Sequence, residues 1–341
     1  MNNPDITDHL YSFELCYEIA KDSNEIISEG FKMAILLNNN SASGNTAWQQ
    51  ALATQLPEMP VYTYPNIPDP EAIKYALVWN HPVGDLSRYP NLRSILSLGA
   101  GMEHLTKDSD LPDVPLVSLG DPAMSREMAN YALYWVMNAH RHYDQYRCQQ
   151  RNQYWQPLDV IPPESFNVLV LGLGRIAQDV ARTVQQAGFG VKAWDFKAKA
   201  IDGIDSYHGN EALPDLLKPV DVVICCLAVN SRSLQLINGA FLKQMPRKSY
   251  LVNISRGAII DEDALLSALD KLQISGATLD VMSVEPLPKA HRLWRHSRVS
   301  MTPHIAGPTV PETAVKVIAA NIRRMESGQL PEPIFDRSRG L

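Results

Sequence analysis

The most constraining feature of this 341-residue chain is an apolar run that ends in a glycine turn. Residues 168–177, V-L-V-L-G-L-G-R-I-A, follow the pattern G-x-G-x-x-A between a buried strand and a helix. Gly172 permits the tight turn, Gly174 lets backbone approach a pyrophosphate, and the small Ala177 allows close packing of helix on strand. Free N–H groups at the start of the helix favour phosphate binding. The segment predicts a dinucleotide site with contacts from Gly172, Gly174, Arg175 and Ile176.

An acidic residue stands at the end of the next predicted strand. This residue is Asp195, in V-K-A-W-D. A carboxylate at this place accepts hydrogen bonds from the adenosine ribose hydroxyls and repels a 2′-phosphate, so Asp195 favours NAD(H). Lys192, Lys197 and Lys199 lie close in sequence, and a nearby cation can accommodate a 2′-phosphate. NADP(H) therefore stays open as the second form.

Apolar strand patterns alternate with helical patterns from residue 33 onward. Helices are predicted at residues 46–55, after a turn at residues 43–45, at residues 125–153, after the breaker Gly120-Asp121-Pro122, and at residues 309–325. Such alternation predicts parallel sheets with helices on both faces, here as two doubly wound α/β domains, the second inserted into the first. The predicted strands are residues 34–37, 61–64, 75–79, 94–98, 116–118, 167–171, 190–194, 222–227, 249–254, 276–280 and 299–301.

The acidic, polar residues 1–32 form an N-terminal extension before the first predicted strand. Their weak helical pattern fits an added helix that packs on the surface or on a partner. A mis-set start codon, with Met33 as the true beginning, accounts for them equally well. The two interpretations stay open from the sequence alone.

Composition restricts the partners of the chain. With 31 Lys and Arg against 37 Asp and Glu, the formal charge is −6, which argues against nucleic-acid binding. The longest apolar run, residues 220–229, is too short to span a bilayer, and no signal peptide is apparent. None of the four cysteines has zinc-like spacing, so no metal site and no disulfide framework are expected. We expect a cytoplasmic protein that acts on a small molecule.

Three polar side chains follow three successive predicted strands of the second half. They are Arg256 in N-I-S-R-G, Glu285 in D-V-M-S-V-E-P and His304 in T-P-H-I-A-G. Reducing a 2-keto acid requires a cation for the carboxylate and an acid that protonates the developing alkoxide. A guanidinium suits a carboxylate, and an imidazole paired with a carboxylate suits proton delivery. Each residue alone has an ordinary structural role open to it, but their joint position at successive strand ends favours a catalytic set.

Several motifs together resemble the D-isomer-specific 2-hydroxy acid dehydrogenase family. They occur in the family's order and cover most of residues 33–320. The glyoxylate/hydroxypyruvate reductase branch is the most similar, on the segments A-L-V-W (76–79), L-G-A-G-M-E-H-L (98–105) and Y-W-Q-P-L (154–158). The family motifs are L-G-L-G-R-I-A (171–177), N-I-S-R-G-A-I-I-D (253–261), G-A-T-L-D-V (276–281), E-P-L-P (285–288) and T-P-H-I-A-G (302–307).

The resemblance implies a Rossmann nucleotide-binding domain at residues 124–307. It is inserted into a flavodoxin-like substrate-binding domain formed by residues 33–123 and 308–341. A homodimer built on the nucleotide domain and the long linking helix is implied as well. Two departures concern the cofactor contacts: Asn130 stands where the family usually has an acid, and Ala228 stands where it has a proline.

The resemblance also implies a role for each site residue. Arg256 binds the substrate carboxylate and carbonyl, and His304 donates the proton with Glu285 as its partner. Glu103 and His104 are expected to stabilise the loop after Gly101. The implied cofactor contacts include Leu227, Ala228 and, at the nicotinamide end, Asp280; the backbone N–H groups of Ala100 and Gly101 hold the substrate carboxylate from the other domain.

The expected reaction is reduction of a small 2-keto acid, similar to glyoxylate or hydroxypyruvate, to the D-2-hydroxy acid. A D-3-phosphoglycerate or D-lactate-type dehydrogenase is an alternative within the same class. From a different class, a non-catalytic NAD(H)-sensing protein stays open, with the acidic N-terminal segment as its only support.

Overall fold

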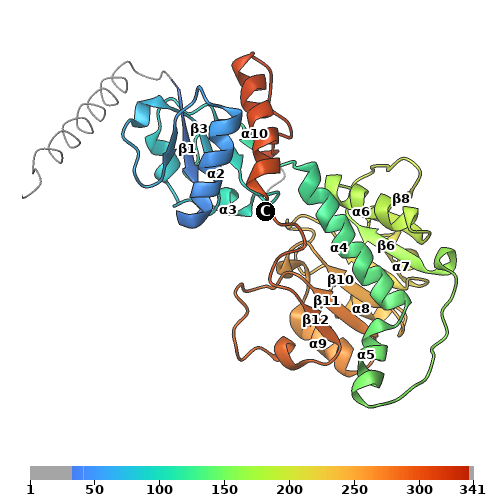
Figure 1. Ribbon diagram of the computed structural model, residues 1–341. Coiled ribbons are helices and arrows are strands. Elements are labelled where there is room, and N and C mark those ends of the chain that lie inside the picture. The colour runs from blue at the N-terminus through green and yellow to red at the C-terminus, as the bar shows by residue number, and fades with distance from the viewer. Residues whose placement is uncertain (1–32, 41, 338–341) are drawn as a thin grey trace, which may run out of the picture. The chain divides into compact units, whose positions relative to one another are not determined.

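The computed structural model describes residues 33–40 and 42–337 (Figure 1). Residues 1–32, whose origin the sequence leaves open, lie outside the described residues. The chain divides into two compact units. Unit 1 takes its described residues from Met1–Leu98, Lys107–Ser118 and Ile318–Phe335, and unit 2 takes them from Gly99–Thr106, Leu119–Val317 and Asp336–Leu341. The predicted boundaries of a substrate domain and a nucleotide domain stay predictions.

Unit 1 contains a parallel sheet whose described strands run in the order β2-β1-β3-β4-β5. This is the flavodoxin-like order 2-1-3-4-5, as predicted. Strands β1 and β3, which lie inside the sheet, are almost entirely buried, which explains their mostly apolar sequences. The strands are β1 (Ala34–Asn38), β2 (Val61–Thr63), β3 (Ile73–Val78), β4 (Ser94–Ser97) and β5 (Leu116–Val117).

The helix α2 (Ala42–Gln55) begins earlier than the sequence predicts. The turn predicted at residues 43–45 is wrong, because these residues belong to the first turn of α2. The side chain of Asn45 is buried and accepts a hydrogen bond from the Asn39 backbone N–H at 2.8 Å, which fixes the chain entering the helix. Unit 1 also contains the short 3-10 turns η1 (Pro70–Ala72) and η2 (Asp85–Arg88) and the end of α10 (Pro311–Glu326).

Unit 2 contains a second parallel sheet, whose described strands run in the order β12-β11-β10-β9-β6-β7-β8. Counted from β6 within this unit, the order is 7-6-5-4-1-2-3, which is the doubly wound dinucleotide-binding arrangement. The edge strand β8 is absent from the predicted set, because its largely exposed residues carry no apolar pattern. The strands are β6 (Asn167–Leu171), β7 (Gly190–Asp195), β8 (Asp205–His208), β9 (Val222–Cys225), β10 (Tyr250–Asn253), β11 (Gly276–Leu279) and β12 (Val299–Met301).

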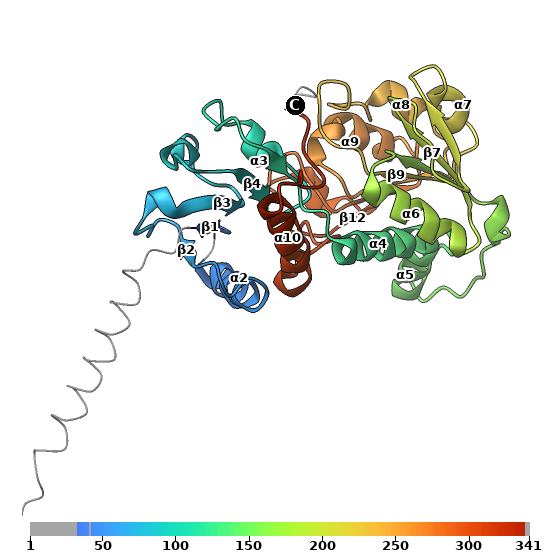
Figure 2. The same ribbon diagram turned by 90° about the horizontal axis from the view of Figure 1, so that it is seen from above.

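Helices cover both faces of this sheet (Figure 2). On one face α4 and α6 bury apolar side chains such as Val136 and Val180 against the strands. On the other face α7, α8 and α9 do so around Leu217, Phe241 and Leu265. The helices of unit 2 are α3 (Glu103–Thr106), α4 (Pro122–His140), α5 (Tyr143–Arg151), α6 (Arg175–Gln186), α7 (Leu213–Leu217), α8 (Gly239–Gln244) and α9 (Glu262–Asp270), with the 3-10 turns η3 (Pro163–Ser165), η4 (Gly257–Ile259) and η5 (Arg292–Arg295).

The single helix predicted over residues 125–153 is wrong. The structure has two helices, α4 and α5, which are separated at His142 with a left-handed φ of 58°. The apolar spacing continues only to the end of α4, and none of the residues of α5 is buried. Periodicity alone could not show this break, because no glycine or proline marks it.

The carboxylate of Asp121 connects the first turns of α4 and α10. One oxygen accepts the Ala123 N–H at 2.8 Å and so caps α4, while the other accepts the Thr313 hydroxyl at 2.6 Å. Asp121 is only 3% exposed, so water has little access to replace this carboxylate as the hydrogen-bond acceptor.

We predict that Asp121→Ala lowers the free energy of unfolding by about 1 to 3 kcal/mol, because it removes the cap of α4 and one acceptor of the Thr313 hydroxyl. Chemical denaturation measures the change. Thr313→Val is the control, since it keeps the cap and removes one bond, with an expected cost of about 1 kcal/mol. Equal losses in the two variants would contradict the capping role.

Candidate active site

The glycine turn lies at the carboxyl end of β6, beside the point where the strand order reverses. Gly172 has a φ of 115°, and a Cβ there would lie 3.0 Å from the Cys226 carbonyl oxygen. A Cβ at Gly174 would meet no described atom within 4 Å. The turn is thus closed on the strand side and open at Gly174, in front of the first turn of α6. These residues fit a bound pyrophosphate.

Asp195 is tied to the same turn by its carboxylate. One oxygen accepts the Leu173 N–H at 3.0 Å, and the other accepts the Phe196 N–H at 2.7 Å. The side chain therefore helps to hold the turn in shape, besides standing where a ribose is expected.

The other predicted cofactor contacts have different surroundings. The Arg175 guanidinium donates to the Gly120 carbonyl oxygen, and Ile176 packs against the core beneath α6. Leu227 is buried in the core on the other face of the sheet, whereas Ala228 is exposed and its carbonyl oxygen accepts the Ser233 hydroxyl at 2.7 Å. Their contacts with a cofactor stay predictions.

Arg256 follows β10 and lies in extended backbone. A glycine is required after it, because a Cβ at position 257 would lie 1.9 Å from the Met282 carbonyl carbon. Buried Asn253 holds the same segment, accepting the Ser255 hydroxyl at 2.7 Å and donating to the Arg256 carbonyl oxygen at 3.0 Å. The N-I-S-R-G sequence thus builds a rigid base for the guanidinium.

The Arg256 guanidinium pairs with Glu103. From the sequence, Glu103 was expected to stabilise the loop after Gly101. Nε lies 3.1 Å from Glu103 Oε1, and Nη2 donates to Oε2 at 3.4 Å. A Cβ at Gly101 would lie 1.8 Å from Nη2, so the backbone of Gly101 is packed against this pair. Residues 99–106 belong to unit 2, the same unit as Arg256, whereas the sequence placed Ala100 and Gly101 in the other domain. Their contact with a substrate carboxylate stays a prediction.

His304 and Glu285 form the predicted pair. His304 Nδ1 lies 2.8 Å from Glu285 Oε2, and Glu285 Oε1 accepts the Met282 N–H at 2.8 Å. Both side chains are partly exposed, at 43% and 37%. No described residue bonds His304 Nε2, which leaves this nitrogen for a reactant.

Asp280 holds the loop that carries His304. It is 2% exposed, and its carboxylate accepts the N–H groups of Ile305 and Ala306 at 2.8 and 2.9 Å and the Thr302 hydroxyl at 2.6 Å. Its backbone carbonyl oxygen accepts the His304 N–H at 2.8 Å. These bonds keep His304 at its left-handed φ of 56°, which is uncommon for a residue with a side chain. The sequence did not indicate this structural role, and the predicted contact of Asp280 with nicotinamide stays a prediction.

The structure brings the predicted triad to one edge of one sheet. Strands β10, β11 and β12 are adjacent and parallel, and Arg256, Glu285 and His304 follow their carboxyl ends in turn. Among the described residues, no cluster of His, Cys, Asp and Glu could hold a metal ion. The described helices include none with the length and apolar character needed to cross a bilayer.

Comparison with known proteins gives one consistent result. Residues 133–306 match the model of the D-isomer specific 2-hydroxyacid dehydrogenase NAD-binding domain. Two curated relatives are each named glyoxylate/hydroxypyruvate reductase A. The protein from Serratia proteamaculans is 37% identical over 295 residues, 85% of this chain and 94% of the relative. The protein from Yersinia enterocolitica is 36% identical over 299 residues, 86% and 95% of the two chains.

Solved structures agree with this. A D-isomer specific 2-hydroxyacid dehydrogenase from Xanthobacter autotrophicus, in complex with NADPH and MES, is 36% identical with a TM-score of 0.87 and covers 91% of this chain and 100% of its own. An NADPH-dependent glyoxylate/hydroxypyruvate reductase from Sinorhizobium meliloti, in complex with NADP and sulfate, is 26% identical with a TM-score of 0.84 and the same coverage. The chain, with its two parallel-sheet units and its dinucleotide turn, belongs to the D-isomer-specific 2-hydroxyacid dehydrogenase family of oxidoreductases, in the branch similar to glyoxylate/hydroxypyruvate reductase A.

Proposed function

We propose that this protein reduces a small 2-keto acid, of the glyoxylate or hydroxypyruvate type, to the D-2-hydroxy acid. The names of relatives at 36 to 37% identity support the substrate class, and the family's D-isomer description supports the configuration. The observation that carries the proposal is the set Arg256, Glu285 and His304 at three adjacent strand ends beside a dinucleotide turn.

Arg256 binds the carboxylate of the keto acid and polarises its carbonyl. A guanidinium offers paired N–H donors that match a carboxylate, and this one is fixed by its neighbours before a substrate arrives. The backbone N–H groups of Ala100 and Gly101 add donors for the same carboxylate. Donors that are already oriented need no rearrangement as negative charge develops on the oxygen.

His304 delivers the proton to the substrate oxygen through Nε2. A bound nicotinamide supplies the hydride for the carbonyl carbon. Glu285 accepts the Nδ1 hydrogen, which orients the ring and stabilises its positive charge before the proton leaves. The Met282 N–H holds the second Glu285 oxygen and keeps the carboxylate facing the ring.

We predict that His304→Asn lowers kcat for glyoxylate by about 10² to 10⁴-fold, because general acid catalysis is lost while asparagine accepts a left-handed backbone. NADPH affinity, followed by nicotinamide fluorescence, stays unchanged. His142→Asn is the matched control, since His142 has a similar φ of 58° at the junction of α4 and α5. Turnover in His304→Asn equal to that of the control would refute the assignment.

The wild-type protein is assayed in parallel with glyoxylate, hydroxypyruvate, pyruvate, phenylpyruvate and 3-phosphohydroxypyruvate. A preference for pyruvate or for the phosphorylated acid would favour the D-lactate or D-3-phosphoglycerate alternative. Tight NADPH binding without reduction of any acid would favour the sensing protein. Chiral analysis of the product tests the D-configuration.

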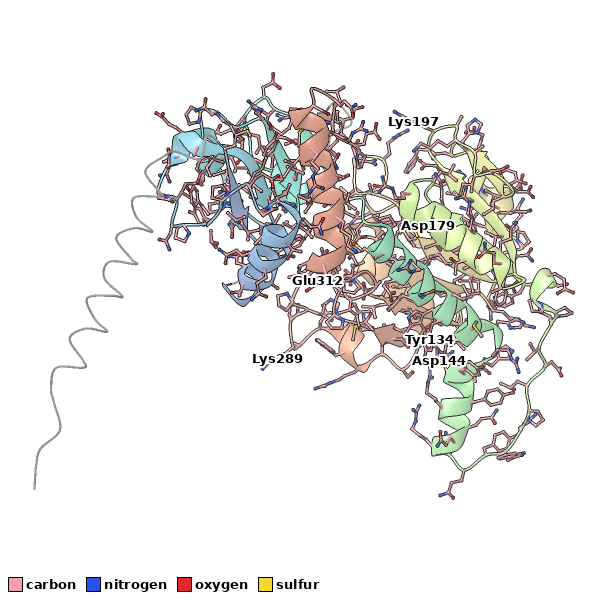
Figure 3. All side chains as sticks on the ribbon, turned by 45° about the horizontal axis from the view of Figure 1, so that its top comes forward. Tyr134, Asp144, Asp179, Lys197, Lys289 and Glu312 are labelled. Carbon is pink, nitrogen blue, oxygen red and sulfur yellow. The ribbon has the colours of Figure 1, made fainter. Side chains whose placement is uncertain are left out.

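We further propose that the cofactor is NADP(H). The relatives solved with NADPH or NADP support this form over NAD(H), which Asp195 alone favours. Asp195 also accepts two backbone N–H groups of the turn and of the residue after it. Arg232 stacks 4.7 Å from the ring centre of Phe196, the next residue, and Lys197 lies on the same loop (Figure 3). These cations would offset Asp195 and bind a 2′-phosphate.

We predict that Arg232→Ala raises KM for NADPH by roughly tenfold, because a phosphate loses a charge-assisted contact. KM for NADH is the internal control and changes little, since NADH lacks the 2′-phosphate. A wild-type protein with a lower KM for NADH than for NADPH would contradict the proposal. It would support NAD(H), the form that Asp195 favours.

We also propose a homodimer that uses α4, α5 and the segment after them. Tyr134 and Met137, three residues apart on α4, are 50% and 42% exposed. Trp155 is 96% exposed and Tyr154 is 58% exposed on the following segment. Figure 3 shows Tyr134 and Asp144 close together where α4 meets α5. Four exposed large side chains on this part of the chain support burial against a second copy. The cytoplasmic location stays a prediction.

We predict that Trp155→Glu shifts the protein from dimer to monomer in sedimentation velocity, because an interface must then bury a charge. Trp294→Glu is the matched control, since Trp294 is 54% exposed on η5, outside this surface. A wild-type protein that sediments as a monomer, or variants that behave alike, would refute the proposed interface.

A further inference from the structure

The contact between Glu103 and Arg256 uses only one side of the guanidinium. The Glu103 carboxylate binds the Nε side of the guanidinium: Oε1 lies 3.1 Å from Nε, and Oε2 accepts a hydrogen bond from Nη2 at 3.4 Å. The Ser255 carbonyl oxygen accepts a hydrogen bond from one N–H of Nη1 at 2.7 Å. A guanidinium has five N–H bonds, so one bond on each terminal nitrogen is left among the described residues. The two terminal nitrogens Nη1 and Nη2 form the end fork of the guanidinium, which is the donor pair that a substrate carboxylate can use.

The side on which Glu103 binds decides its effect. A carboxylate on the end fork would compete with an anionic substrate. A carboxylate on the Nε side instead fixes the direction in which the end fork points. The two side chains are 23% and 29% exposed, so water screens the pair less than a surface ion pair.

The chain around Glu103 is built to permit this contact. Glu103 begins the short helix α3, which Leu105 anchors with 2% exposure. A Cβ at Gly101 would lie 1.8 Å from Nη2 and 2.5 Å from Glu103 Oε2, so only glycine leaves room for the pair. The Arg256 side of the contact is held by Asn253, whose side-chain amide donates to the Arg256 carbonyl oxygen.

We propose that Glu103 is a positioning residue for substrate binding, which holds Arg256 side-on so that its end fork faces the substrate carboxylate. The proposal rests on the proposed reduction of a 2-keto acid. It assigns Glu103 a function that acts through Arg256, in addition to the stabilisation of its own loop.

The first test separates action through Arg256 from a general loss of structure. Glu103→Ala is expected to lower kcat/KM for glyoxylate by about 10 to 100-fold, mostly through KM, while KM for NADPH changes less than about twofold. Asp270→Ala is the matched control, because it removes a carboxylate that pairs with Arg292 in the same unit. If Glu103→Ala does not fold, Glu103→Gln replaces it, since the amide keeps the volume but places a donor against Nη2.

A double-mutant cycle with Arg256→Lys gives the decisive comparison. If Glu103 acts through the guanidinium, its removal costs less than about twofold once lysine replaces Arg256. Losses that multiply in the double variant, or a Glu103 variant with wild-type kcat/KM, would overturn the proposal.

A readout without turnover distinguishes failure of this inference from failure of the proposed function. The ¹⁵Nε–H resonance of Arg256, assigned by its loss in Arg256→Lys, is expected to shift and to exchange faster with water in the Glu103 variant. An inactive wild type refutes the proposed reaction, and with it the role of Glu103 in substrate binding. A resonance that Glu103→Gln leaves unchanged refutes the positioning itself.

Discussion

A buried carboxylate, that of Asp280, organises the loop on which the proposed chemistry depends. Burying a charge is costly unless hydrogen bonds replace the lost water, and here three donors of one loop do so. Thr302 also bonds the Tyr131 hydroxyl at 2.6 Å, which links the loop to α4. His304 can therefore stand partly exposed, in an uncommon backbone conformation, and still face Glu285.

The parallel sheet explains how much of the site the sequence could predict. Carboxyl ends of parallel strands meet at one edge, so Arg256, Glu285 and His304 could be grouped from the strand pattern alone. Gly172 and Gly174 could be found in the same way, because a glycine turn between a buried strand and a helix is typical of dinucleotide binding. Local sequence was sufficient wherever a residue's place depends on its own strand.

Features that depend on contacts distant in sequence were missed. Glu103 lies 153 residues from Arg256, and nothing near either residue indicates the pair. No glycine or proline marks the break at His142, and the largely exposed strand β8 carries no apolar pattern. Under the proposed NADP(H) preference, the phosphate form of the cofactor depends on several charges around Asp195, and a single acidic residue is then a weak guide to it.

The bonds to Asp280 also bear on how this site can diverge during evolution. The backbone N–H of Ile305 donates to the Asp280 carboxylate, whereas the Ile305 side chain is 52% exposed. Every residue except proline carries that N–H, so drift at position 305 can reshape the surroundings of His304 without loosening the loop. Under the proposed function, selectivity for different acids can change here at little cost to the fold, next to a proposed proton donor that stays in place.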